Sequence, residues 1–201
     1  TFPSKMAAEI KDFRPADFIS EHNEIKRMAR SSHLAIASAR LAAEDSALPS
    51  SDQKDCSVIL GSSTSGVEYI LPEAYAFERG GINKVKPYVG IAGFVGSISS
   101  EISRALGAQG QSHTISTGCT SANDALGYAL RNIQYGYSDL VITGGTDACI
   151  SDGILAAFCR MGATSTRNDF KKASRPFNKD RDGFVIAEGS WLFVLEELEH
   201  A

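Results

Sequence analysis

The feature that most constrains the fold is an alternation between short β-branched runs and segments of helical periodicity. Three apolar runs each lead into a turn rich in glycine or serine, and a helical pattern follows. The runs are residues 56–60, 113–117 and 139–143. Continuous apolar runs bounded by turn residues are typical of buried strands. Because strands that alternate with helices form a largely parallel sheet covered by helices, the sequence predicts an α/β fold.

The rest of the chain extends this pattern. Apolar residues recur at three- and four-residue steps in the predicted helices, which cover residues 24–46, 67–79, 91–106, 120–135 and 151–160. Pro72 is expected to interrupt the second helix, and Gly107 to end the third. Residues 164–182 are polar and irregular, and residues 184–186 and 191–195 are predicted to form two closing strands.

Composition places the chain among ordinary globular proteins. Its 201 residues carry 20 Lys and Arg against 24 Asp and Glu, and 43% are hydrophobic, which suits one domain with a sizeable core. The net charge of −4 lacks the basic excess of nucleic-acid binders, and no apolar stretch is long enough to cross a membrane. No secretory signal is visible, so we expect a cytoplasmic protein without nucleic-acid or membrane partners.

The cysteines give little sign of a metal or a disulfide framework. Cys56, Cys119, Cys149 and Cys159 form no Cys-x-x-Cys pair and lack the spacing of zinc ligands, so we expect no metal site. In a chain of this size we expect reduced thiols, three of them serving as small buried hydrophobic residues.

Cys119 stands apart because it lies between a predicted strand and the first turn of a predicted helix. Gly118 permits a sharp turn that a side chain would forbid, and Thr120 and Ser121 are candidates to satisfy unpaired N–H groups at the helix start. A helix N-terminus lowers a thiol pKa, and its N–H groups suit a developing oxyanion. The position is that of a nucleophile elbow. The alternative is that Cys119 merely fills a tight turn.

Four sequence blocks, in order and with matching spacing, carry a resemblance to a known family. The first reads Ser-Thr-Gly-Cys-Thr-Ser-Ala at residues 116–122, and the others are residues 139–147, 163–169 and 174–185. Together they resemble the β-ketoacyl synthases, condensing enzymes of the thiolase-like superfamily, over most of the chain. The first block and Ala187-Glu-Gly look closer to the ketosynthase-alpha subunits of aromatic polyketide systems than to fatty-acid enzymes.

The resemblance implies a thiolase-like layered fold, in which a mixed, mostly parallel sheet lies between helices. It also implies a decarboxylative Claisen condensation: Cys119 accepts an acyl group as a thioester, and malonyl carrier protein loses carbon dioxide to supply the attacking carbanion. Gly118 and Thr120 are implied to contact the substrate. Phe158 matches an aromatic residue that lines the acyl pocket, with a plain core role as the alternative. No cofactor is implied, because substrates arrive on the phosphopantetheine of acyl carrier protein.

Residues 1–201 are expected to form only the N-terminal half of such an enzyme. Both ends of the chain look cut, and the family's first core strand and its C-terminal half, which carries two histidines, have no counterpart. His113, the nearest histidine in sequence, is separated from Cys119 by extended residues spanning about 20 Å, against the ~3 Å of a base–nucleophile hydrogen bond. We therefore expect this polypeptide alone to be inactive in condensation.

Two regions are expected to contact partners. Residues 164–182 carry six basic residues against three acidic ones, which makes them a candidate docking surface for an acidic acyl carrier protein. A solvated loop with internal ion pairs is the alternative. Residues 85–117 match the family region that forms the dimer, which implies a homodimer or a heterodimer with a chain-length factor.

Other interpretations stay open. Cys119 would also serve a thiolase-superfamily acyltransferase or hydrolase that does not decarboxylate its substrate, or be vestigial in a non-catalytic subunit that binds carrier protein. Gly144-Gly145 and the turn at residues 61–66 do not match phosphate-binding motifs, and close backbone packing around Cys119 explains them better. Asp147 and Glu188 are expected to bond to loop backbone rather than to act as acid or base.

Overall fold

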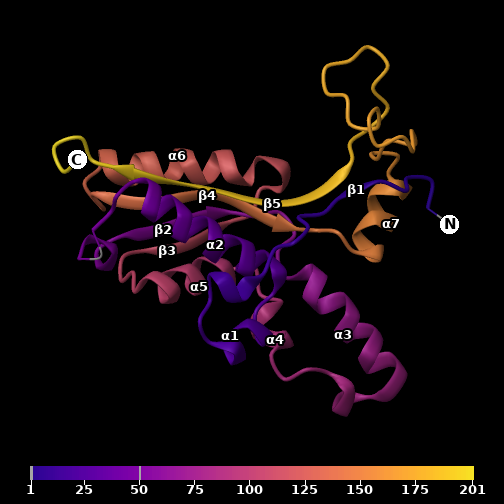
Figure 1. Ribbon diagram of the computed structural model, residues 1–201, viewed down its shortest axis with the longest axis horizontal. Helices are drawn as coiled ribbons and strands as arrows, with labels where there is room; N and C mark the ends of the chain where they lie inside the picture. The colour runs from indigo at the N-terminus through magenta and orange to yellow at the C-terminus, as the bar shows by residue number, and fades with distance from the viewer. Residues whose placement is uncertain (1, 50) are drawn as a thin grey trace.

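The computed structural model describes residues 2–49 and 51–201 and has an α/β arrangement around one sheet (Figure 1). The strands are β1 (Ala7–Ala8), β2 (Ser57–Gly61), β3 (Ser112–Ile115), β4 (Leu140–Ala148) and β5 (Ile186–Glu196). They lie in the order β1-β5-β4-β2-β3. β4 and β5 pair antiparallel, whereas the other neighbours pair parallel. The predicted mixed, mostly parallel sheet is therefore confirmed.

The helices follow the predicted order along the chain. The α-helices are α1 (His22–Lys26), α2 (Arg30–Asp45), α3 (Val67–Gly80), α4 (Val89–Ala92), α5 (Ser97–Leu106), α6 (Ser121–Gln134) and α7 (Asp152–Arg160). Short 3₁₀ turns are η1 (Pro15–Asp17), η2 (Asp52–Lys54), η3 (Ile82–Lys84) and η4 (Gly118–Thr120). Within the residues that the structure describes, none of these helices has the length and apolar character needed to cross a bilayer.

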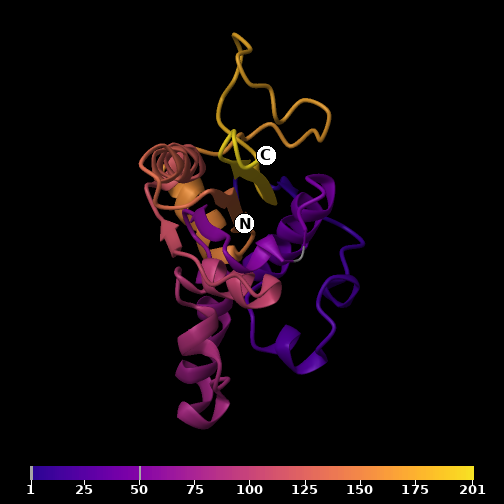
Figure 2. The same ribbon diagram turned by 90° about the vertical axis from the view of Figure 1, so that its left-hand side faces the viewer.

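The two faces of the sheet are covered by different helices. Side chains alternate across a strand, so Val58 and Leu60 of β2 join the main core with α2 and α5. Ile59, between them, packs instead in a second cluster with Ala125 and Ala129 of α6. Figure 2, turned by 90°, shows α6 end on at one face of the sheet, with α2 across from it. The result is a helix–sheet–helix stack, as expected for a layered fold.

Two predicted helices are each divided in the structure. The segment 24–46 breaks between α1 and α2, because Ala29 is extended (ψ 157°) and this bend carries Met28 into the core. The segment 91–106 breaks between α4 and α5. A Cβ at Gly93 would lie 2.3 Å from Cγ1 of Ile70, so the break lets the backbone pack directly against α3.

Three other boundaries also differ from the prediction. Pro72 lies inside α3 without interrupting it, because a proline removes only one backbone donor and the rest of the helix can continue. Gly144-Gly145 do not end their strand, since β4 continues to Ala148. The two predicted closing strands are one strand, because Glu188 and Gly189 stay in register with Ala148 and Asp147 and so join them.

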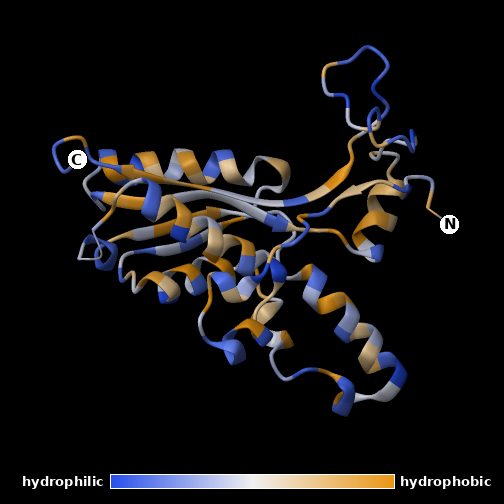
Figure 3. Ribbon diagram, in the orientation of Figure 1, coloured by the Kyte–Doolittle hydropathy of each residue, from blue (hydrophilic) through white to orange (hydrophobic). Residues whose placement is uncertain are grey.

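Residues 164–183 form the predicted irregular loop, which projects from the sheet (Figure 1) and is largely hydrophilic (Figure 3). Asp182 holds the loop together: its carboxylate accepts from Oγ of Ser165 at 2.7 Å and from Nη2 of Arg175 at 2.7 Å. Several contacts hold the pKa of Asp182 well below its usual range, and the hydrogen bond from Ser165 contributes most to this lowering. Arg175 therefore stabilises the loop from within and is not part of a free basic surface.

Candidate active site

Cys119 lies where the sequence predicts it, in η4 between β3 and α6. Its side chain is exposed. Gly118 has φ +68°, and a Cβ there would meet nothing within 4 Å, so glycine is needed for its left-handed backbone and not for space. The thiol thus stands at the amino end of a 14-residue helix, where N–H groups have no intrahelical partner and carry partial positive charge.

The hydroxyls beside Cys119 stabilise the turn in a way that differs from the prediction. Ser121 Oγ donates to the carbonyl of Gly118 at 2.6 Å and accepts from the N–H of Thr117 at 2.9 Å. Thr120 Oγ1 donates to the carbonyl of Thr117 at 3.1 Å and to Asp124 Oδ2 at 3.2 Å. No side chain caps α6. The predicted caps are wrong because η4 runs directly into the helix, so both hydroxyls fold back onto the turn.

Glycines let the start of α6 touch the sheet at backbone distance. A Cβ at Gly61 would lie 2.2 Å from the carbonyl carbon of Ser121, and one at Gly145 would lie 2.6 Å from Cβ of Ala122. Real Cβ atoms do not approach so closely, so a side chain at either position would push the helix away. The close-packing interpretation is confirmed for Gly61 and Gly145, which hold Cys119 over the ends of β2 and β4, whereas Gly144 packs against β5 and Gly66 against Gly93.

Asp147 fastens the loop after β2. Its carboxylate accepts from the N–H groups of Ser63 at 3.1 Å and Thr64 at 2.8 Å, and from the hydroxyl of Ser62 at 3.0 Å. This is the loop-bonding role that the sequence predicts. Both carboxylate oxygens are already engaged, which makes Asp147 a structural support beside the cysteine and not a free base.

Glu188 has a similar structural role on the other face. It accepts two hydrogen bonds from Arg30, each 2.7 Å, and a third from the N–H of Ile10 at 2.9 Å. Burial alone would raise the pKa of Glu188, but the hydrogen bonds from Arg30 and from the N–H of Ile10, together with the charge of Arg30, outweigh burial and lower the pKa. The carboxylate is therefore held ionised to tie the N-terminal segment to β5.

A cavity of about 400 Å³ opens beside Cys119, a size within the range of small-molecule sites. Gly61, Gly144 and Gly145 contribute backbone to it. The remaining lining residues are Ser63, Gly118, Cys119, Ser121, Ala122, Asn123, Leu126, Thr146, Asp147, Gly189, Trp191 and Phe193. The lining thus combines polar residues with large apolar side chains.

The structure brings together only some of the predicted site residues. Cys119 and Gly118 line the cavity, whereas Thr120 lies in the same turn without lining it. Phe158 packs edge to face on Phe184, with 5.1 Å between ring centroids, and is not among the lining residues. Its role in an acyl pocket stays a prediction. The sequence reading missed Trp191, although its place two residues before Phe193 on one strand was a usable signal.

No histidine lines the cavity among the described residues. His113 is exposed on β3, where it pairs with Ile59. His33 bonds through Nε2 to the carbonyl of Ile25 at 2.9 Å, and burial lowers its pKa. His200 pairs with Glu196. Among the described residues, the candidate nucleophile Cys119 therefore has no histidine beside it in its cavity.

The other cysteines are less uniformly buried than predicted. Only Cys56 is buried, whereas Cys149 and Cys159 are half-buried, and all are free thiols. Cys149 donates to the carbonyl of Ala187 at 3.1 Å, and Cys159 lies beside the hydroxyl of Thr164 at 3.3 Å. Both stand at element ends, where packing is incomplete. In the described ranges no cluster of three or more His, Cys, Asp or Glu side chains is arranged to hold a metal ion.

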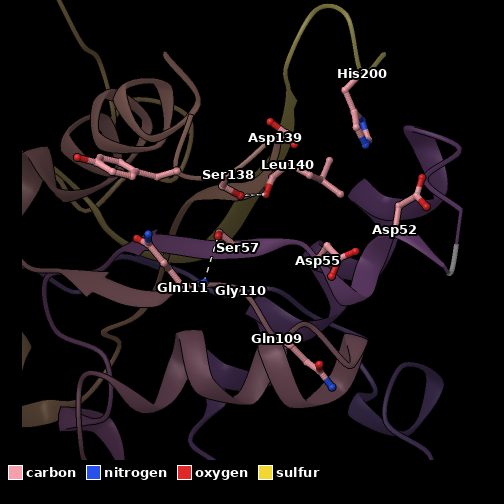
Figure 4. Close-up of a pocket in the computed structure, with 11 residues that line it drawn as sticks. Asp52, Asp55, Ser57, Gln109, Gly110, Gln111, Ser138, Asp139, Leu140 and His200 are labelled. Carbon is pink, nitrogen blue, oxygen red and sulfur yellow. Dashed lines mark hydrogen bonds between the residues drawn. The ribbon is translucent and has the colours of Figure 1, made fainter. Parts of the chain in front are cut away.

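A larger cavity, about 660 Å³, lies at the opposite end of the sheet (Figure 4). Asp52, Asp55, Asp139 and His200 surround it. It contains no cysteine, and it adjoins the amino ends of β2 and β4 rather than their carboxyl ends. Ligands of open α/β sheets bind at the carboxyl ends of the strands, so the smaller cavity at Cys119 is the candidate active site.

The layered sheet and the cysteine turn define a class, that of the thiolase-like proteins. A solved structure described as the ishigamide ketosynthase/chain length factor superimposes with a TM-score of 0.81 at 30% identity, covering 95% of this chain and 47% of that one. The chain belongs to the beta-ketoacyl synthase family: the family's sequence profile for the N-terminal domain matches residues 2–201.

Two curated relatives show how broad the similarity is. The 3-oxoacyl-[acyl-carrier-protein] synthase 2 of Synechocystis is 34% identical over 98% of this chain and 48% of its own length. A Streptomyces cyaneus protein assigned as polyketide beta-ketoacyl synthase 1 is 36% identical over 98% of this chain and 49% of its own length. The chain thus spans about half the length of the curated relatives it matches. Their names include both 3-oxoacyl-[acyl-carrier-protein] synthases and polyketide beta-ketoacyl synthases.

Proposed function

We propose that this chain supplies the nucleophile of a 3-oxoacyl-[acyl-carrier-protein] synthase acting in the cytoplasm in fatty-acid or polyketide synthesis. The observation that carries the proposal is the exposed Cys119 at the amino end of α6, opening into a cavity of about 400 Å³. A buried thiol, or one without a neighbouring cavity, would not be reachable by a substrate on a pantetheine arm.

Cys119 performs the first half of the reaction. Its thiolate attacks the carbonyl carbon of an acyl thioester, the pantetheine thiol leaves with a proton, and the acyl group remains on Sγ as a new thioester. N–H groups at the start of α6 stabilise the negative charge on the carbonyl oxygen during the attack. In the second half, malonyl carrier protein loses carbon dioxide and its carbanion attacks that thioester, releasing Cys119. No histidine among the described residues lines the cavity in which this second half of the reaction would take place.

An experiment on the full-length protein distinguishes this proposal from its two alternatives, which are an acyltransferase or hydrolase without decarboxylation and a non-catalytic subunit. Incubation with a short acyl-pantetheine is expected to add one acyl mass to the peptide that contains Cys119, and malonyl carrier protein is then expected to release carbon dioxide. Labelling without carbon dioxide release would favour an acyltransferase or hydrolase. No labelling would favour a non-catalytic subunit. The matched control is Cys159→Ala, which should label as the unmodified protein does.

Two partners belong to the same proposal. An acidic acyl carrier protein is expected to dock on the basic side chains of the loop 164–183, in which Lys171 and Lys172 are exposed. A second subunit, either a copy of this chain or a chain-length factor, is expected at β3, because β3 is an edge strand of the sheet and a free edge can pair with another chain.

The docking proposal has its own test. Reversing the charge at Lys171 and Lys172 to Glu is expected to slow acylation of Cys119 by a carrier-bound acyl group about tenfold, because steering of an acidic partner is lost. Acylation by a small acyl-pantetheine should not change, since that substrate needs no docking surface. Equal slowing with both donors would contradict a docking role.

A further inference from the structure

Two large aromatic side chains stand on the same face of β5. Trp191 and Phe193 are two residues apart, so they point to one side of the sheet. Leu192, between them, points to the other side and is buried in the main core with α2. Leu195 continues the first series and packs against the cluster under α6. Trp191 and Phe193 therefore share the face of the sheet on which α6 and Cys119 lie.

α6 does not cover these aromatic side chains. The helix packs mainly over β4 and β2 and touches β5 only slightly. Within the described part of the chain, Trp191 keeps 76% of its surface exposed and Phe193 keeps 47%. An exposed indole is an apolar surface of large area that is available for contact with a ligand or with further protein.

Both side chains line the cavity that contains Cys119. Trp191 is directly opposite Gly145 in the strand register, and Gly145 is the residue that admits the first turn of α6. Because Gly145 has no side chain, its position on β4 places nothing between the first turn of α6 and the indole. Leu126 of α6 extends the apolar side of the same cavity.

We propose that Trp191, supported by Phe193, determines which acyl groups Cys119 accepts, by forming the wall against which an apolar acyl chain lies. The inference rests on the proposed acyl-transfer function. The cavity is also lined by the polar residues Ser63, Asn123 and Asp147, which suit the amides of a pantetheine arm rather than hydrocarbon. The cavity thereby sorts the two ends of an acyl-pantetheine by polarity.

The test compares two thioesters on the full-length protein. Trp191→Ala is expected to lower kcat/KM for acylation of Cys119 by hexanoyl-pantetheine about tenfold, mainly through KM, because several methylene groups lose their apolar contact. Acetyl-pantetheine, too short to gain from the wall, should change less than about twofold. Trp191→Phe should restore most of the loss. Phe77→Ala, which removes an exposed aromatic ring on α3, is the control and should leave both thioesters unchanged.

Each outcome decides between distinct explanations. An equal loss for the two thioesters, with a fall in Tm, would mean that Trp191 packs against other protein, and it would overturn the specificity role. Unchanged kinetics with both substrates would overturn it as well. Failure of the unmodified protein to be acylated by either thioester would instead reject the proposed function, because that result does not depend on Trp191.

Discussion

The two ends of the central sheet both have a cavity and a nearby cysteine, yet only one end is suited to chemistry. At the amino ends of the parallel strands, the cavity is large and surrounded by Asp52, Asp55 and Asp139, and Cys56 just before β2 is buried. At the carboxyl ends, the cavity is smaller, and Cys119 is exposed at the start of α6.

The difference teaches that strand polarity, not cavity size, marks the end of the sheet that holds the candidate nucleophile. In a parallel sheet the following helices begin at the carboxyl ends of the strands, so unpaired N–H groups and positive helix ends gather there. At the amino ends of the strands Cys56 is buried, and burial, only partly offset by a backbone hydrogen bond from Ile142, raises the pKa of its thiol to about 11.

The largest expected effect comes from exchanging the two cysteines for alanine. In the full-length protein, Cys119→Ala should lower the rate of acyl transfer about a thousandfold or more, because the covalent intermediate cannot form. It should leave Tm nearly unchanged, since the side chain is exposed. Cys56→Ala should do the reverse: it should cost about 1–2 kcal/mol of unfolding free energy and leave the acylation rate almost intact.

Acylation kinetics and urea denaturation of both variants measure this contrast. Iodoacetamide labelling of the unmodified protein gives an independent check, with alkylation expected at Cys119 well before Cys56. Comparable loss of activity in the two variants would break the distinction between the sheet ends.

A smaller effect is expected at the glycines against which the start of α6 packs. Gly61→Ala would place a methyl group 2.2 Å from the carbonyl carbon of Ser121, so the start of α6 must move. We expect a loss of about 2–4 kcal/mol in the unfolding free energy and slower acylation, because Cys119 shifts with the helix. The matched control is Gly127→Ala on the same helix, where a Cβ meets nothing within 4 Å.

Gly127→Ala should stabilise the protein by about 0.5–1 kcal/mol, since alanine has the higher helix propensity. Urea denaturation measures both variants, and a change of the same sign in both would show that close packing at Gly61 is not what positions the helix.

Local pattern was enough to predict most of the fold. The alternation of apolar runs with helical segments placed β2, β3 and α6 within a few residues, because these elements depend on their own periodicity. The breaks at Ala29 and Gly93 could not be predicted, since they arise from contacts with residues far along the chain, such as Ile70. The single strand β5 likewise depends on its pairing with β4, which no local pattern contains.

The candidate site likewise contains some residues that the local sequence predicts and others that it does not. Cys119, Gly118 and the packing glycines were predictable because the turn sequence itself encodes them. Trp191 was only partly predictable: its spacing from Phe193 puts both side chains on one face, but their exposure requires knowing that α6 leaves β5 uncovered. The hydrogen bonds of Thr120 and Ser121 differ from prediction for a related reason: helix propensity does not reveal that η4 joins α6 without a break.

The smallest expected effect is the pH dependence that Cys56 contributes at the amino end. Burial raises the pKa of its thiol from an ordinary value of 9.0 to about 11, so between these values the unfolded chain ionises while the folded chain stays neutral. The contribution of the neutral thiol is therefore complete below pH 9 and is lost as pH rises toward 11. At pH 10.5 the loss approaches about 2 kcal/mol.

Other ionising groups are common to both proteins, so the stability difference between the unmodified protein and Cys56→Ala reports the ionisation of the Cys56 thiol. We expect that difference, from urea denaturation, to shrink or reverse between pH 8 and pH 10.5. A difference that stays constant would mean that Cys56 ionises as readily in the folded protein as in the unfolded chain. Burial would then not hold the Cys56 thiol neutral, and the contrast between the two cysteines would rest on their exposure alone.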